Sequence, residues 1–288
     1  MRFFVDELSL AGEFSKEVLE IDRLSDLLDA MERLQKIDQC SLFIAPNFYN
    51  LEFSGLSIAQ LIFQERSTEF RDLVLRLQRA IDATVELGET VIDNGINRLQ
   101  SEGRGGLVSL IDRAASDWWN ADGMRMLIRV SEMPKVLRFL FVVFDLDEED
   151  LEATQSAMFP GLYFYVFPTC KKLNVNGKVW VQTIIQHLSW LNDEAAIAFA
   201  SRFQDVINIA GSSGVEISSE SPKTHRDAAA MKEREILIAT KPVLCEWHSK
   251  FEATNGRLHF NAFSSRSKEV EAVVGKKVII GIAAAHLK

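Results

Sequence analysis

Four side chains with the chemistry of phosphate-ester cleavage lie close together near the C-terminal end of the sequence. They are His248, Lys250, Arg257 and His259. Two imidazoles that titrate near neutral pH can serve as general base and general acid, while lysine and arginine hold a phosphate and stabilise developing negative charge. On one shared surface, these groups suit metal-independent cleavage of RNA, with the ribose 2′-hydroxyl as the internal nucleophile.

The residues around these side chains alternate between polar and apolar, which is typical of half-buried β-strands. Asn255-Gly256 separates the two alternating runs and is a preferred dipeptide of the two-residue type I′ turn, because both of its positions need positive φ. The sequence therefore predicts a β-hairpin with a defined register. The predicted pairs are Thr254–Arg257, Glu252–His259, Lys250–Asn261 and His248–Phe263.

Period-two alternation assigns the side chains of this hairpin to two faces. The apolar face receives Cys245, Trp247, Phe251, Leu258 and Phe260. The polar face receives Glu246, His248, Lys250, Glu252, Arg257, His259 and Asn261. We expect the polar face to look outward and to engage RNA or a protein partner. His248 and His259 are the catalytic candidates, and the candidates for binding the phosphate or partner are Lys250, Arg257, Glu252 and Asn261.

Other interpretations of the polar face remain open at this stage. Antiparallel sheets often expose a mixed-charge solvated face, on which Glu252 would simply pair with His259 across the strands. A zinc site formed by His248, His259 and His286 is a further alternative, although the spacing of these histidines is not that of a known zinc motif. No cofactor is expected from the sequence.

Carboxylates elsewhere suggest a different enzyme. Asp6 follows an apolar run at the N-terminus, and Asp145 and Asp147 follow a second one. Carboxylates gathered at the ends of parallel strands would bind Mg²⁺ or Mn²⁺ and support phosphodiester hydrolysis, as in a metal-dependent nuclease. The simpler interpretation is that acids here begin helices, with Asp147 as a capping residue.

The order of apolar patterns predicts an α/β or α+β fold, with a mixed α/β body at residues 1–210 and a C-terminal antiparallel β-hairpin module. Gly211 to Lys223 is rich in glycine and serine and resembles a linker, so residues 224–288 would form a separate helix and β module. The segments predicted as strands are 3–5, 41–44, 138–144, 162–167, 178–181 and 277–287. The segments predicted as helices are 21–37, 57–63, 68–81, 182–191, 194–209 and 224–238. The glycines at 103, 105 and 106 predict a turn.

Composition restricts the class of protein. The chain has 288 residues and a formal charge of −9, yet Lys241 to Lys288 holds eight Lys and Arg against four Asp and Glu. A basic tail on an acidic body suits a segment that faces nucleic acid or a partner. No apolar run approaches the roughly 20 residues that cross a bilayer. An early acid, Asp6, and three widely spaced cysteines lead us to expect a cytoplasmic protein in a reducing compartment.

Short motifs at both ends of the chain carry a resemblance. They are Phe4-Val5-Asp6-Glu7, Gly55-Leu56-Ser57, Glu246-Trp247-His248-Ser249-Lys250, Arg257-Leu258-His259-Phe260 and Val278-Ile279-Ile280-Gly281. The chain resembles a family of uncharacterised bacterial proteins with a C-terminal Trp-His-x-Lys and Arg-Ile-His-Phe signature. The strand pair also resembles the small sheet of ribosome-dependent RNase toxins, which are shorter and more basic.

The resemblance implies a bacterial defence-associated protein, either anti-phage or toxin-like, in which the basic and histidine-bearing β-face engages RNA or a partner. The alternative is a non-enzymatic interaction subunit of a multi-protein defence complex. No membrane partner is expected.

Overall fold

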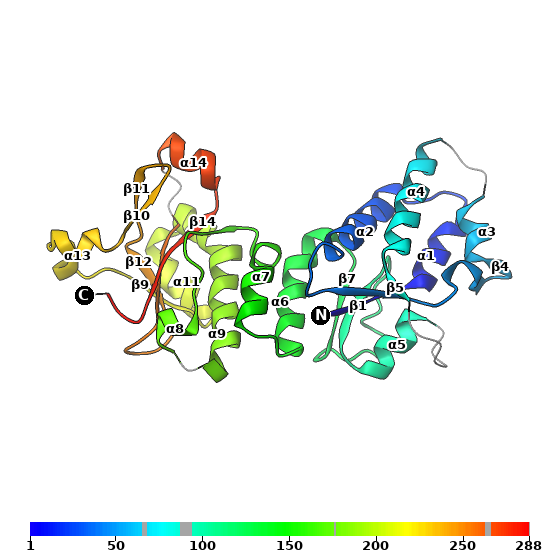
Figure 1. Ribbon diagram of the computed structural model, residues 1–288, viewed down its shortest axis with the longest axis horizontal. Helices are drawn as coiled ribbons and strands as arrows, with labels where there is room; N and C mark the ends of the chain where they lie inside the picture. The colour runs from blue at the N-terminus through cyan, green and yellow to red at the C-terminus, as the bar shows by residue number, and fades with distance from the viewer. Residues whose placement is uncertain (65–67, 87–93, 176, 263–265, 288) are drawn as a thin grey trace. The chain divides into compact units, whose positions relative to one another are not determined.

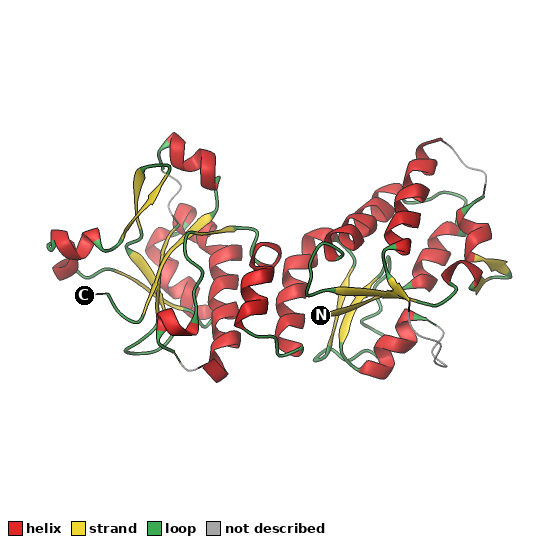
Figure 2. Ribbon diagram, in the orientation of Figure 1, coloured by secondary structure: helices red, strands yellow, loops and turns green. Residues whose placement is uncertain are grey.

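The computed structural model describes residues 1–64, 68–86, 94–175, 177–262 and 266–287. The chain forms two compact units, Met1–Leu146 and Asp147–Lys288, and both combine helices with a β-sheet (Figures 1 and 2). The expected mixed α/β class is confirmed, with a parallel sheet in the first unit and antiparallel strand pairs near the C-terminus. Within the described part of the chain, no helix is both long and apolar enough to span a bilayer.

The first unit is built on a parallel five-stranded sheet in the order β5-β2-β1-β6-β7. Its strands are β1 (Arg2–Val5), β2 (Ser41–Ile44), β5 (Val85–Glu86), β6 (Gly105–Val108) and β7 (Met124–Leu127). The chain leaves β1 first toward β2 and later toward β6, so β1 is the central strand. This parallel pairing confirms the predicted strand, helix and strand of the first 45 residues.

The helices of the first unit carry apolar stripes. They are α1 (Glu7–Phe14), α2 (Ile21–Leu34), α3 (Ile58–Ile62), α4 (Thr68–Asp82), α5 (Gly95–Glu102) and α6 (Met133–Val143). Of these, α2, α5 and α6 pack against the sheet. The buried residues of α2 recur at spacings of three and four, as the sequence predicts. Ser57 begins α3 with a capping box, its side chain accepting from the Gln60 backbone N–H. A small hairpin of β3 (Glu52–Phe53) and β4 (Leu56–Ser57) precedes α3.

Two predictions for the first unit are wrong. Residues 138–144 belong mostly to helix α6, in which Leu137, Leu140 and Phe141 are buried at helical spacing; a dense apolar run does not distinguish a buried strand from a buried helix. Of the glycines expected to form a turn, Gly103 does end α5 with a φ of 67°, but Gly105 and Gly106 belong to strand β6. A Cβ on Gly106 would lie 2.3 Å from the Phe3 ring, so this glycine permits the close approach of β1.

The second unit contains a mixed five-stranded sheet in the order β8-β14-β13-β12-β9. Its strands are β8 (Leu162–Phe164), β9 (Glu216–Ser219), β12 (Trp247–Lys250), β13 (Arg257–Asn261) and β14 (Val278–Ala284). Only the β14–β8 pair of this sheet is parallel. A separate hairpin joins β10 (Glu235–Ile238) and β11 (Lys241–Leu244).

The helices of the second unit are mostly short. They are α7 (Glu148–Met158), α8 (Cys170–Leu173), α9 (Gly177–Trp190), α10 (Ala196–Ser201), α11 (Val206–Ser212), α12 (Pro222–His225), α13 (Ala228–Lys232) and α14 (Lys268–Val274). A π-helical turn, η3 (Leu191–Ala195), links α9 to α10. Residues 178–181 therefore lie in a helix rather than in the predicted strand, and 235–238 form a strand rather than the end of a helix.

The division between the units also differs from the expectation. It falls between Leu146 and Asp147, whereas residues 211–223 contain the end of α11, the strand β9 and the start of α12. The polar, glycine-containing composition suggested a linker, but Ile217 is buried and β9 pairs with β12 as an edge strand. Long-range pairing of this kind leaves no trace in local composition.

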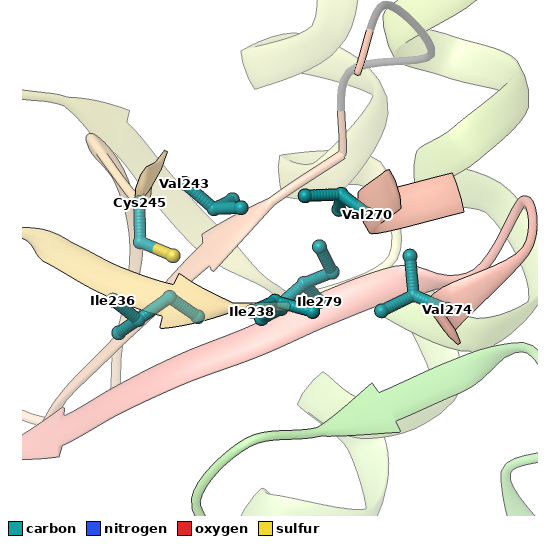
Figure 3. Packing of buried hydrophobic residues seen from close by; sticks show 7 residues of the cluster. All are labelled: Ile236, Ile238, Val243, Cys245, Val270, Val274 and Ile279. Atoms are coloured by element: carbon teal, nitrogen blue, oxygen red, sulfur yellow. The ribbon is translucent and has the colours of Figure 1, made fainter. Parts of the chain in front are cut away.

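Both faces of the second sheet are covered. On one face, Phe199 of α10 packs edge-on against Trp247 and Phe260, with ring centroids 4.9 Å and 5.8 Å away. The other face lies under the β10–β11 hairpin and α14. Figure 3 shows the buried cluster between them. Its members are Ile236, Ile238, Val243, Cys245, Val270, Val274 and Ile279.

Candidate functional site

Strands β12 and β13 form an antiparallel pair in a register other than the predicted one. The observed pairs are Trp247–Phe260, His248–His259, Ser249–Leu258 and Lys250–Arg257. The pairing continues beyond Lys250–Arg257, because the Phe251 N–H donates to the Gly256 carbonyl at 2.9 Å and the Glu252 N–H to the Asn255 carbonyl at 3.1 Å. The chain therefore reverses at Ala253-Thr254, and the predicted turn at Asn255-Gly256 is wrong. Gly256 has a φ of 73°, but Asn255 is not among the described residues of positive φ, and a type I′ turn needs both.

The Arg257 side chain holds the segment between the two strands. Its guanidinium donates to the carbonyl oxygens of Glu252, Ala253, Asn255 and Gly256 at 2.8 to 3.2 Å. These bonds add to the backbone hydrogen bonds that close the reversal. Because the register is displaced by an even number of residues, His248, Lys250, Arg257 and His259 still share one face, as the alternation predicts.

That face does not look outward. The exposed fractions are 2% for His259, 7% for Arg257 and 8% for Asn261. The covering elements explain this burial: the Asn261 amide donates to the Leu244 carbonyl at the end of β11, and Ile282, opposite His259, packs against the cluster of Figure 3. The prediction of an exposed polar face is therefore wrong, because local alternation cannot show that a second layer covers it.

Cys245 packs with the β10–β11 hairpin and α14, which cover the polar face, and not on the face that carries Trp247. It belongs to the cluster of the β10–β11 hairpin, and a Cβ on Gly281 would come within 2.3 Å of its sulfur. The alternation predicted Cys245 on the apolar face beside Trp247. It fails here because β11 ends at Leu244 and β12 begins only at Trp247, so the chain changes direction between them.

A glutamate joins the two histidines on the covered face. One oxygen of Glu220, Oε1, lies 3.6 Å from His248 Nδ1 and 3.7 Å from His259 Nδ1. The same oxygen lies 2.7 Å from Arg234 Nε. The two imidazole rings are 5.1 Å apart between centroids. Glu220 follows the last residue of β9, and the pairing of β9 with β12 places it beside His248.

Burial keeps both imidazoles neutral. Desolvation lowers the pKa of His248 to about 4, with Glu220 acting in the opposite direction. Desolvation, together with the neighbouring His248 and Arg234, lowers the pKa of His259 to about 3, and the backbone of Cys245 opposes this shift. Neutral imidazole is the form that binds a metal ion, whereas a base and acid working near neutral pH need pKa values closer to 7.

The hydrogen bonds of the two histidines differ. His248 Nε2 lies 3.0 Å from the Ser218 hydroxyl, which leaves Nδ1 directed at Glu220. No hydrogen bond of good geometry joins either ring nitrogen of the buried His259 to a described residue, although the Cys245 backbone interacts with the ring. Buried polar atoms are nearly always bonded, so an orphan of this kind requires an explanation such as a bound ion.

Glu220, His248 and His259 form a group with metal-ligating capacity, with one donor atom from each residue lying within 4.8 Å of the others. Sequence reasoning considered His248 and His259 but missed Glu220, which falls in the segment interpreted as a linker. His286, the third histidine of the zinc alternative, is exposed beyond the end of β14 and is not in this group.

The predicted phosphate-binding residues have other partners. Lys250 Nζ forms an ion pair of 2.6 Å with Glu216 on β9, and Arg257 holds the 251–256 connection. Asn261 bridges the Leu244 carbonyl and the Arg266 side chain. Glu252 is exposed in the connection and does not lie opposite His259. The face that carries these residues is therefore internally bonded.

The predicted carboxylate cluster of Asp6, Asp145 and Asp147 is not formed among the described residues. Asp6 is buried at the end of β1, where it accepts from the Ser109 hydroxyl at 2.7 Å and pairs with Arg113 at 3.0 Å. Asp145 follows helix α6 instead of a strand. Asp147 caps α7, accepting from two backbone N–H groups, as the simpler interpretation predicted.

A third buried histidine was not singled out from the sequence. His187 of α9 bonds through Nδ1 to the Ser249 hydroxyl and stacks on Phe251 at 4.5 Å. Since Ser249 alternates with His248 along β12, this pair lies on the opposite face of the sheet. Both side chains are buried, which makes the pair part of the core.

Comparison of the chain with protein-family models, curated proteins and solved structures gave no significant match.

Proposed function

We propose that the second unit binds a divalent transition-metal ion, of which Zn²⁺ is the reference case, through Glu220, His248 and His259. The observation that carries this proposal is the convergence of His248 Nδ1 and His259 Nδ1 on one buried carboxylate oxygen of Glu220, while neither nitrogen of His259 makes a hydrogen bond of good geometry among the described residues. Two imidazoles and one carboxylate are a common ligand set for zinc and other first-row metals.

The distances support the proposal. Ligand atoms about 2.0–2.1 Å from a tetrahedral zinc lie roughly 3.4 Å from one another. The observed separations of 3.6 and 3.7 Å between Glu220 Oε1 and the two Nδ1 atoms differ from this value by a few tenths of an ångström. Ser218 supplies the outer hydrogen bond to His248 that metal-ligating histidines usually have.

Metal binding would join three strands of the sheet. Glu220 follows β9, while His248 and His259 belong to β12 and β13. Three protein ligands also leave at least one coordination position for another group. The proposed function is thus a metal-binding module, and its ligands come from segments far apart in the sequence.

Zinc titration of the metal-depleted full chain tests this proposal. We expect one strong site per chain, and at least a tenfold weaker affinity in His248→Ala and in His259→Ala. His286→Ala is the matched control, because His286 is exposed and outside the group. Circular dichroism would verify that each variant folds. Binding that is unchanged in both site variants, or no binding by the wild-type chain, would overturn the proposal.

A second candidate function is RNA engagement in a bacterial defence role. The observation that favours it is the shared face of His248, His259, Lys250 and Arg257, which keeps together the groups required for metal-independent cleavage. It requires the covering layer to move, because His259 is buried. An RNase activity that resists EDTA and is lost in His248→Ala would support it. A stable protein complex without turnover would favour the interaction-subunit alternative.

A further inference from the structure

We propose that Arg234 is an internal competitor of the metal ion: its guanidinium pairs with the Glu220 carboxylate in the metal-free protein, and the metal displaces it. This inference rests on the proposed metal site. Arg234 Nε lies 2.7 Å from Glu220 Oε1, the same oxygen that faces both histidines. Glu220 Oε1 is thus both the atom that pairs with Arg234 and the atom that would ligate the metal.

Burial makes the competition strong. The side chains of Arg234 and Glu220 are exposed by only 4% and 7%. Two cations on one oxygen repel each other far more in such surroundings than in water, because the effective dielectric constant is lower. A guanidinium and a divalent ion therefore do not share this carboxylate without a large electrostatic cost. One of them holds Glu220 at a time.

Displacement of Arg234 from Glu220 by the metal would also loosen the chain between these two residues. Glu220 and Arg234 are the ends of the β9–β10 connection, residues 221–233, which contains α12 and α13. Their ion pair closes this connection at its base, and Arg234 donates at 2.6 Å to the Ala230 carbonyl within it. The connection is largely exposed and carries Lys223, Arg226 and Lys232. When the metal takes Glu220, the connection loses the ion pair that closes it.

A zinc titration of Arg234→Gln tests the competition. We expect this variant to bind zinc at least tenfold more tightly than the wild-type chain, because the competing cation is gone. Arg226→Gln is the matched control, since Arg226 is an exposed arginine of the same connection, and its affinity should equal that of the wild type. Equal or weaker binding by folded Arg234→Gln would overturn the inference.

Limited trypsin digestion of the wild-type chain is an independent test of the competition. It applies even if Arg234→Gln does not fold. We expect zinc to accelerate cleavage within residues 221–233, with trypsin activity on a short peptide measured at the same zinc concentration. Unchanged or slower cleavage would overturn the inference. If zinc binds to neither the wild type nor Arg234→Gln, the metal site itself is wrong. If it binds equally to both, only the competition is wrong.

Discussion

His248 and His259 lie directly opposite each other on β12 and β13, with ring centroids 5.1 Å apart, and both face one carboxylate oxygen of Glu220. In solvent, two such rings would repel when protonated and would be candidates for acid and base catalysis. Burial lowers both pKa values far below neutrality. The pair is therefore better suited to donating lone pairs than to exchanging protons near pH 7.

The two cations of the predicted phosphate site should differ sharply in their effect on stability. Arg257→Ala removes a buried side chain that donates to four backbone carbonyls, so we expect a loss of about 2–4 kcal/mol in the free energy of unfolding. Lys250→Ala removes a partly exposed ion pair with Glu216 and should cost less than about 1 kcal/mol. Urea denaturation measures both values, and similar losses for the two variants would contradict the assigned roles.

His187 should destabilise the protein in acid. Desolvation lowers its pKa from 6.5 to about 4, so the folded state resists protonation more than the unfolded state does. The stabilising contribution is complete above pH 6.5 and is lost as the pH falls toward 4, by about 3 kcal/mol at most. Unfolding free energies of wild type and His187→Gln should therefore converge in acid. His286→Gln, an exposed control, should follow the wild-type pH profile, and parallel curves for His187→Gln would refute this account.

Glu7 should destabilise the protein as the pH rises, whereas His187 does so as the pH falls. Burial raises the pKa of this carboxyl from 4.5 to about 7, although backbone N–H groups of Gly95 and Ala45 oppose the shift. Its contribution is complete below pH 4.5 and is lost as the pH rises through 7, by about 3 kcal/mol at most. Glu7→Gln cannot titrate, so its stability relative to wild type should increase between pH 5 and 8. The exposed Glu17→Gln is the control, and a constant difference across this pH range would contradict the prediction.

Gly106 should not tolerate a methyl group. A Cβ there would lie 2.3 Å from the Phe3 ring in the centre of the parallel sheet, and such overpacking costs about 1–3 kcal/mol. Gly12 of α1 is the matched control, since a Cβ there meets only Phe53 at an ordinary 3.7 Å. Gly12→Ala should stabilise the helix by roughly 0.5–1 kcal/mol. Thermal unfolding of both variants tests the assignment, which fails if Gly106→Ala melts at the wild-type temperature.

Elements with a strong local signal could be predicted. The buried stripe of α2, the short helix that begins after Ser57, the strands β1 and β2 and strand β14 all agree with the sequence pattern. The apolar run at 138–144 was misassigned, because a fully buried helix and a fully buried strand look alike when no polar residue reveals the period. The hairpin turn was misplaced by two residues, because the chain reverses at Ala253-Thr254, where Arg257 donates to the surrounding carbonyls, a contact that propensity rules do not include.

Alternation along a strand is a local property of the backbone, so the amino-acid pattern alone was enough to predict which side chains of β12 and β13 share a face. The tertiary structure alone shows that this face is covered, that Glu220 lies beside His248 and His259, and that Arg234 forms an ion pair with the same oxygen. Those relationships arise from the pairing of β9 with β12 and from the packing of the β10–β11 hairpin. Both are long-range contacts, and their energies depend on residues that no local window contains together.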